Sequence, residues 1–449
     1  MNSLKKILGG NTRQFGMIFA LIALVLFFQW QTDGKTLTPA NMMNLFNGNS
    51  YILILAIGMV LVIIAGHIDL SVGSVAAFVG IVVAIAMRDW GLPWWAGILL
   101  GLALGAGIGA WQGFWVAYVG IPAFIVTLAG MLLFRGANQF VGKSNTVPVP
   151  QEFQYIGAGY LPEVGPDTGY NNLTLLLGLF LVAVVVRNEI MNRRRLRGLG
   201  AEVPEAWVSA VKLVLLCGAI LYATYLFATG RPGTSFPVPG IILGLLVIVY
   251  VFVSSRTVLG RHVYAVGGNR HAAELSGVKS RRVNFVVMLN MSVLAALAGM
   301  IFVGRSTASG PFDGTGWELD AIAAVFIGGA AVTGGVGTVV GAIIGGLVMA
   351  VLNNGLQLLG IGADATQIIK GLVLLVAVAF DVYNKSQGKP SITGLLARGI
   401  GGRRPAAEPE APGQPTDRTS LFHFHKETRQ CTETPHDPSR WPPPSRRSP

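Results

Sequence analysis

The sequence predicts an all-α, polytopic membrane protein of about 10 to 12 transmembrane helices with an inverted internal repeat and a disordered C-terminal tail. Of its 449 residues, 52% are apolar and only 12% are charged, and the mean hydropathy is +0.59. A soluble domain has about a quarter charged residues. The 59 glycines fit a membrane protein, because small residues let membrane helices approach closely.

The positive charge of the chain follows the topology of a membrane protein rather than indicating nucleic acid. The net charge of +12 comes mainly from the N-terminus, the loops 187–206 and 255–282, and the segment from Lys385 onward. A topology of about twelve spans puts all of these segments in the cytoplasm and the long loop 141–170 outside. We therefore expect a cytoplasmic N-terminus at 1–14, a transmembrane domain at 15–400 and a cytoplasmic, disordered tail at 401–449.

The apolar runs define the expected spans. Two stretches, 50–70 and 318–333, are short enough to be broken or re-entrant helices. The expected spans are 15–30, 50–66, 70–87, 93–118, 121–140, 171–187, 207–228, 238–254, 283–303, 318–333, 336–353 and 366–383.

Two of these runs carry a glycine at every fourth position, which predicts a helix face for close packing. The glycines are Gly97, Gly101, Gly105, Gly109 and Gly113, and again Gly337, Gly341 and Gly345. The segments 105–130 and 341–371 also resemble each other weakly and run in opposite directions in the expected topology. An inverted repeat is the common build of transporters; a shared glycine-rich composition is the alternative explanation.

The polar, basic stretch 255–282 lies between two apolar runs and is the main candidate site. Gly267, Gly268 and Asn269 are expected to form a turn, Asn269 to cap a short helix, and Gly277 to end it in the left-handed conformation. The helix would present a small-residue face. That face consists of Ala272, Ala273 and Ser276. A short capped helix between two spans predicts a docking site for a cytosolic partner.

Candidates for a substrate path are polar residues close to the apolar runs. Asp69 opens a span, and its carboxylate is either functional or a cap for the helix that follows. Glu318 and Asp320 open another span and raise the same two alternatives. Amide side chains hydrogen-bond across helices and also suit sugar hydroxyls. The amides concerned are Asn290, Asn353, Asn354 and Gln357.

No constellation predicts catalysis, a metal site or a cofactor. His67 has no evident serine, acid or metal partner, and the spacing of His423, His425, Cys431 and His436 in the tail fits no zinc pattern. The stretch 136–144 resembles a phosphate-binding loop, but it has one residue more between its glycines than that motif allows, and it follows a membrane span. Energy from ATP would therefore have to come from a partner chain.

Four segments together identify a family resemblance. GHIDLSVGSVAAFVG, IPAFIVTLAGMLLFRG, GRHVYAVGGNRHAAELSGV and ELDAIAAVFIGGAAVTGGVGTVVGAIIG resemble, in that order, the ribose/xylose-type permeases of bacterial ABC importers. The resemblance runs from about residue 10 to 400, and the region 188–237 is most similar to xylose-type and multiple-monosaccharide permeases. The tail after Arg403 matches nothing in the family.

The resemblance implies a permease subunit in the bacterial inner membrane that works as a pair, most simply a homodimer. It would carry monosaccharides such as xylose, receive them from a periplasmic binding protein at the loops 141–170, 229–237 and 304–317, and contact a cytosolic ATPase through residues 267–277.

Two other functions compete with this one. The first is an ion-coupled secondary sugar transporter, which predicts a carboxylate buried within a span; in the expected topology every Asp and Glu falls at a span edge or in a loop. The second is a channel or scaffold subunit, which would leave the capped loop helix without a role.

Overall fold

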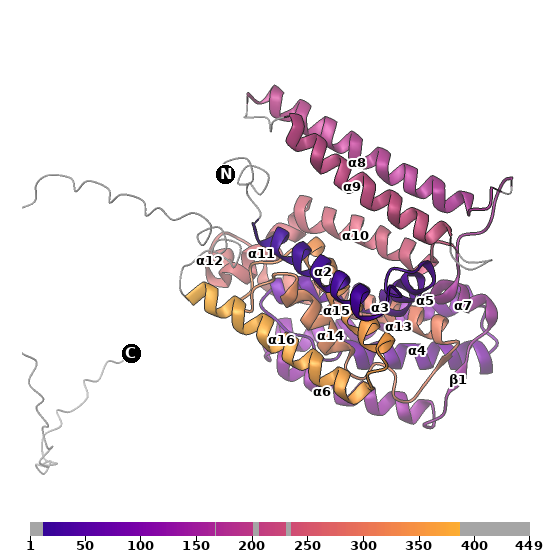
Figure 1. Ribbon diagram of the computed structural model, residues 1–449. Coiled ribbons are helices and arrows are strands. Elements are labelled where there is room, and N and C mark those ends of the chain that lie inside the picture. Colours follow the sequence, from indigo (N-terminus) through magenta and orange to yellow (C-terminus); the bar gives the residue numbers. More distant parts are fainter. Residues whose placement is uncertain (1–11, 167, 201–205, 230–234, 387–449) are drawn as a thin grey trace, which may run out of the picture. The chain divides into compact units, whose positions relative to one another are not determined.

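The computed structural model describes residues 12–166, 168–200, 206–229 and 235–386, and these form a predominantly helical unit (Figure 1). By its internal contacts the chain divides into Met1–Ile400 and Gly401–Pro449. The tail from residue 387 onward, with its predicted disorder and its histidines, lies outside the described residues.

Helices make up nearly all of the regular structure. The first half of the chain contains α2 (Thr12–Gln31), α3 (Pro39–Ile64), α4 (Val72–Asp89), α5 (Trp94–Phe114), the π-helix η1 (Trp115–Val119), α6 (Ala123–Val141), α7 (Gln151–Ala158) and α8 (Asn172–Gly198). The second half contains α9 (Ala206–Ala228), α10 (Val238–Arg256), α11 (Val258–Gly268), α12 (Arg270–Leu275), α13 (Ser280–Ser306), α14 (Trp317–Ile327), α15 (Val339–Leu358) and α16 (Ala363–Ser386). Among the described residues, nine helices are long and apolar enough to cross a membrane, which confirms the predicted class.

Helix α13 forms the centre of the unit, where it packs against α3, α4, α5 and α7. The glycine face of α5 allows close contact with α13. A Cβ added at Gly105 would lie 2.6 Å from the Cβ of Ala296, and one at Gly109 would lie 2.7 Å from the Cα of Leu289. The spacing of four therefore serves close helix packing, as predicted.

Two helix boundaries differ from the sequence prediction, and one expected break is present. In the stretch 50–70, the helix is longer than expected, because α3 begins at Pro39, has 26 residues and ends at Ile64. The run 318–333 is indeed broken: α14 stops at Ile327, and Gly329, Gly334 and Gly335 have positive φ in the turn before α15. Helix α8 continues to Gly198, well past the expected end of its span.

The two segments of the proposed repeat both fold as helix, short connection and helix. The first comprises α5, η1 and α6, and the second comprises α15 and α16. Their opposite orientation across a membrane remains a prediction.

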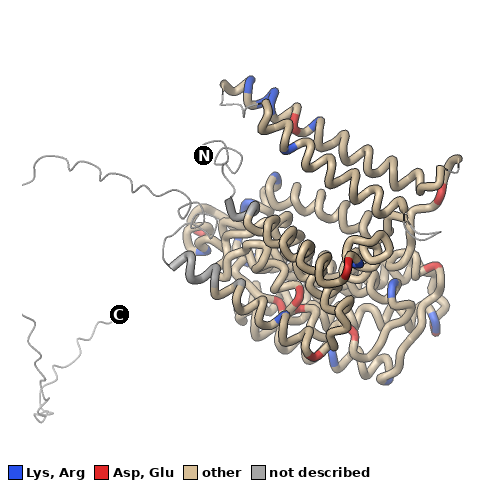
Figure 2. Tube along the Cα trace, in the orientation of Figure 1, with Lys and Arg blue, Asp and Glu red and all other residues tan. Residues whose placement is uncertain are grey.

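The candidate contact segments lie at opposite ends of the unit. Helices α11 and α12 are at the left-hand end in Figure 1, whereas β1 (Val147–Pro148) and α7 are at the right-hand end. Figure 2 shows blue residues at the end of α8, where the loop to α9 begins. We call the two ends of the unit the α12 end and the β1 end.

Candidate functional site

The segment between α10 and α13 folds as two capped helices. Thr257 caps α11, and its hydroxyl accepts a hydrogen bond from the amide of Gly260 at 3.2 Å. Asn269 caps α12, and its side-chain oxygen accepts from the amide of Ala272 at 3.0 Å. Asn269 therefore satisfies one of the free amides of the first turn, as its residue type predicts.

Helix α12 ends in the hydrogen-bond pattern of a Schellman motif. Gly277 has φ of +85°, and its amide donates to the carbonyl of Glu274 at 3.0 Å. The amide of Val278 donates to the carbonyl of Ala273, also at 3.0 Å. Because the left-handed conformation strains a residue with a Cβ, glycine suits this position, and the predicted helix end is confirmed.

Two details of the prediction for this segment are wrong. Gly267 and Gly268 do not form a turn, since they are the last residues of α11. Sequence reasoning missed α11 altogether, although Thr257 is a good capping residue and Val263 and Val266 supply a buried face.

The expected small-residue face of α12 is divided between surface and interior. Ala272 and Ser276 are exposed, but Ala273 is buried against the core. The side chain that sequence reasoning missed is Leu275, which is 80% exposed. Leucine is more often buried, and only the orientation of the helix reveals that Leu275 faces outward.

Glycines join this segment to two other parts of the chain, and we call Gly66, Gly267, Gly268, Gly334 and Gly335 the glycine joint. A Cβ at Gly267 would lie 1.6 Å from the carbonyl oxygen of Ile64, at the end of α3. That oxygen already accepts a hydrogen bond from the amide of Gly335 at 2.8 Å. Three segments therefore meet backbone against backbone.

Further contacts link the same segments of the glycine joint. A Cβ at Gly334 would lie 3.0 Å from the carbonyl oxygen of Gly267 and 3.1 Å from the Cα of Gly66. The hydroxyl of Tyr264 on α11 donates to the carbonyl of Gly337 at 2.7 Å. Helix α11 is therefore in direct contact with the end of α3 and with the turn between α14 and α15.

A basic cavity of about 620 Å³ adjoins α12. Its lining comes from η1, α12 and the beginning of α13. The lining includes Tyr118, Arg270, Glu274, Lys279, Arg281 and Arg282. It therefore has four cationic side chains and one carboxylate. The hydroxyl of Ser280 and the guanidinium of Arg270 donate to Glu274 and hold the pKa of that carboxylate below its usual value, so Glu274 is charged at neutral pH.

At the β1 end, the three loops expected to meet a binding protein are linked to one another. The strands β1 and β2 (Ala308–Ser309) pair antiparallel, which joins the first loop to the third. The amide of Leu161 donates to the carbonyl of Phe236 at 3.1 Å, and the amide of Val238 donates to the carbonyl of Gly159 at 2.9 Å. These bonds join the first loop to the described part of the second.

Asp69 lies in the interior just before α4 and is 0% exposed. One of its oxygens accepts from the amide of Ser71 at 2.8 Å and from the hydroxyl of Ser71 at 2.7 Å. Ser71 occupies the N-cap position of α4, and its hydroxyl also bonds to Gln112 on α5. The second oxygen of Asp69 has no hydrogen-bond partner among the described residues.

The amides considered for a substrate path lie at separate places. Asn354 exchanges two hydrogen bonds of 2.8 Å with Asn41, so its amide group holds α15 against α3. Asn290 accepts from the hydroxyl of Tyr250 on α10. Gln357 is exposed, while Asn353 is half-buried. In the described part of the chain, no hydrogen bond joins any of these path candidates to another or to Asp69.

Two acidic residues of α14 form ion pairs that sequence reasoning missed. Asp320 is 8% exposed and accepts from Lys370 on α16 at 3.0 Å. Glu318 lies 3.6 Å from Arg135 on α6. A position at the edge of a predicted span therefore did not mean exposure, because α14 begins inside the protein. Sequence separation hid the partners.

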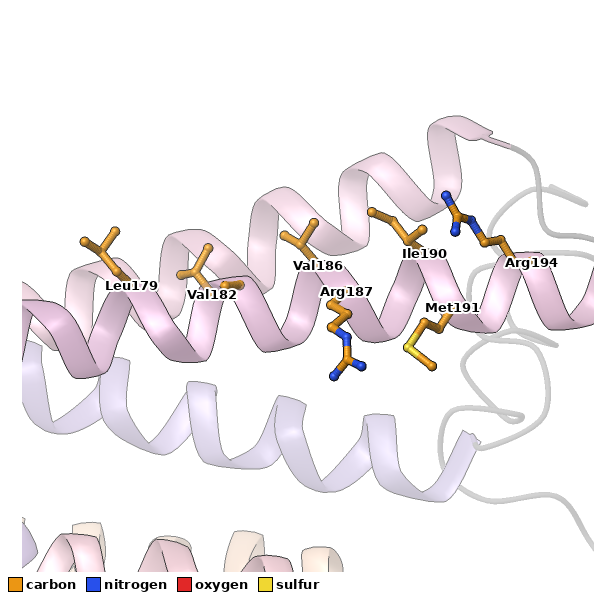
Figure 3. Close-up of a pocket in the computed structure, with 8 residues that line it drawn as sticks. Leu179, Val182, Val186, Arg187, Ile190, Met191 and Arg194 are labelled. Atoms are coloured by element: carbon orange, nitrogen blue, oxygen red, sulfur yellow. The ribbon is translucent and has the colours of Figure 1, made fainter.

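A second hollow, of about 690 Å³, lies along one helix only (Figure 3). It follows α8 from Leu179 through Val186 and Ile190 to Arg194. An apolar helix face that ends in arginines fits hydrocarbon along its length and the charged surface of a membrane at its end.

Among the described residues, no group of three metal-ligating side chains is found.

Comparison with known proteins gives consistent matches over most of the chain. Residues 41–378 match the family described as branched-chain amino acid transport system / permease component. The chain is 40% identical to the xylose transport system permease protein of Haemophilus influenzae over 84% of its own length and 98% of that protein.

Two further relatives carry similar names. The xylose transport system permease protein of Escherichia coli is 40% identical, over 84% of this chain and 93% of that protein. The ribose import permease protein of Escherichia coli is 35% identical, over 78% of this chain and 87% of that protein. No solved structure matches the chain.

Proposed function

The chain belongs to the family of transport-system permease components and is a transporter subunit rather than an enzyme, and from this premise we propose that it carries xylose or a related monosaccharide in an ATP-driven importer. The observation that supports the substrate class is the 40% identity to a xylose permease over nearly the whole of that protein. The family description names branched-chain amino acids, so these are the second candidate.

In this proposal the two ends of the unit bind different partners. A periplasmic binding protein delivers the sugar to the linked loops at the β1 end, and an ATPase subunit docks on α12. The capped ends of α12 support the docking, because a helix fixed at both ends presents Leu275 in a defined orientation. Both chain termini are then cytoplasmic, and two copies of the permease enclose the path.

The glycine joint is the proposed connection between ATP hydrolysis and transport. When the ATPase moves α12, the contact of Gly267 with Ile64 transmits the movement to the end of α3. The segment that follows contains Gly66 and Asp69 and leads into α4. No side chain lies between the backbones at this contact, so little of the displacement is absorbed by rotamer changes.

Uptake in proteoliposomes tests the proposal. The permease is reconstituted with its ATPase subunit and binding protein, and ATP-dependent uptake of xylose, ribose and leucine is compared. We expect sugar uptake that requires both partners and ATP. Uptake of leucine alone would overturn the substrate class, and uptake that needs a proton or sodium gradient instead of ATP would favour a secondary transporter.

A further inference from the structure

We propose that the surface of the ATPase that receives α12 has an apolar groove for Leu275 and carboxylates that face the basic cavity. This rests on the proposed docking at α12 and specifies the chemistry of the partner. The evidence comes from the orientation of α12, from the charge around it and from the position of the cavity.

The orientation of α12 follows from its contacts. Successive residues of a helix are about 100° apart, and Ala273 is the buried member of this one. His271 and Leu275 therefore point away from the protein. Ala272 and Ser276 form one flank, while Arg270 and Glu274 form the other, which lines the cavity. A partner that covers Leu275 must also cover the mouth of the cavity.

The charge of the cavity is left uncompensated by the chain itself. Glu274 pairs with Arg270 at 3.0 Å, but Lys279, Arg281 and Arg282 are exposed and form no ion pair within the described residues. The two arginines also lie in the first turn of α13, where the helix dipole disfavours positive charge. A partner carboxylate would relieve both effects.

An apolar anchor surrounded by complementary charge is a common arrangement in protein interfaces. The anchor supplies most of the affinity, whereas the charged surroundings accelerate association and make it sensitive to salt. Leu275 has the exposure expected of the anchor, since 80% of it is accessible. The two features predict separable effects of substitution.

The test measures binding of the cognate ATPase subunit to the full-length permease in nanodiscs of neutral lipid at several salt concentrations. We expect R281E/R282E to weaken binding by about tenfold at low salt and to abolish most of its salt dependence. The matched control is R195E/R197E, which reverses two exposed arginines at the end of α8 on the same membrane side and leaves binding unchanged. Leu275→Ser weakens binding at every salt concentration.

Each other outcome overturns a definite part of the proposal. If Leu275→Ser weakens binding and R281E/R282E does not, docking at α12 stands but the partner is not acidic there. If neither variant changes binding, α12 is not the docking site and the proposed function of this segment fails. If R281E/R282E matters only in nanodiscs that contain phosphatidylglycerol, the cations contact anionic lipid instead.

Discussion

Replacing Gly267 by alanine tests the glycine joint most directly. The new Cβ would lie 1.6 Å from the carbonyl oxygen of Ile64 and 2.8 Å from the amide of Gly335. Real Cβ contacts begin at 3.0 Å, so α11 must move away and the hydrogen bond between Gly335 and Ile64 is disturbed. Overpacking of this kind costs about 1–3 kcal/mol, against a gain in helix propensity of about 0.5–1 kcal/mol.

The neighbouring Gly268→Ala provides the control: Gly268 also belongs to the glycine joint, but a Cβ there meets no atom within 4 Å. Both substitutions add the same helix propensity, and only Gly267→Ala adds the clash. In proteoliposomes we expect Gly267→Ala to bind the ATPase subunit and hydrolyse ATP, yet to transport about tenfold less sugar per ATP, corresponding to about 1.4 kcal/mol of lost coupling. Equal transport per ATP in the two variants would refute the glycine joint as the connection.

Three further substitutions test the cap and the buried charges. Asn269→Ala removes the cap of α12 and should cost about 1 kcal/mol of local stability, measured as faster amide exchange in α12 and weaker ATPase binding. Asn269→Ser should restore both. Unchanged amide exchange in the alanine variant would contradict the role of Asn269 as a cap. Asp69→Asn retains an oxygen that accepts from Ser71, so we expect uptake to stay within about twofold, which is about 0.4 kcal/mol; a normally expressed but inactive variant would assign Asp69 to the path. Lys370→Met leaves Asp320 buried and unpaired at a cost of about 3–5 kcal/mol, which we expect to see as lower thermal stability in detergent. Adding Asp320→Leu should recover most of the lost stability. If it does not, loss of the ion pair is not the cause of the destabilisation.

The features predicted successfully from the sequence are local ones. The cap at Asn269 and the helix end at Gly277 depend on hydrogen bonds that span a few residues, so the residue types suffice to predict them. The glycine spacing on α5 likewise identifies its packing face within one helix. The class of the protein follows from composition, because a chain this apolar with few charges is typical of membrane helices.

The features missed depend on where a helix lies in the folded protein. Helix α14 begins in the interior, so its first turn holds the buried Asp320 rather than an exposed carboxylate. Leu275 is apolar and nevertheless faces outward, because the inward position of α12 is occupied by Ala273. Glycine composition alone could not reveal the glycine joint, since Gly66, Gly267 and Gly335 come from segments far apart in the chain.

The buried carboxylates of the chain bear on the alternative function of a secondary transporter. A secondary transporter needs a carboxylate buried within a span, and buried carboxylates are present: Asp69 is 0% exposed, Glu318 is 5% exposed and Asp320 is 8% exposed. Asp320 has Lys370 as its partner, and a carboxylate already neutralised by a lysine is poorly suited to bind a coupling ion. Glu318 likewise lies 3.6 Å from Arg135. Asp69 forms no ion pair within the described residues, and it follows directly on the segment that the glycine joint holds. A carboxylate there can respond to the movement of α11 without exchanging an ion, because the end of α3 and the start of α4 move with the backbone that carries it. Transport by Asp69→Asn that is driven by ATP and insensitive to ion gradients would therefore separate a mechanical role from an ionic one.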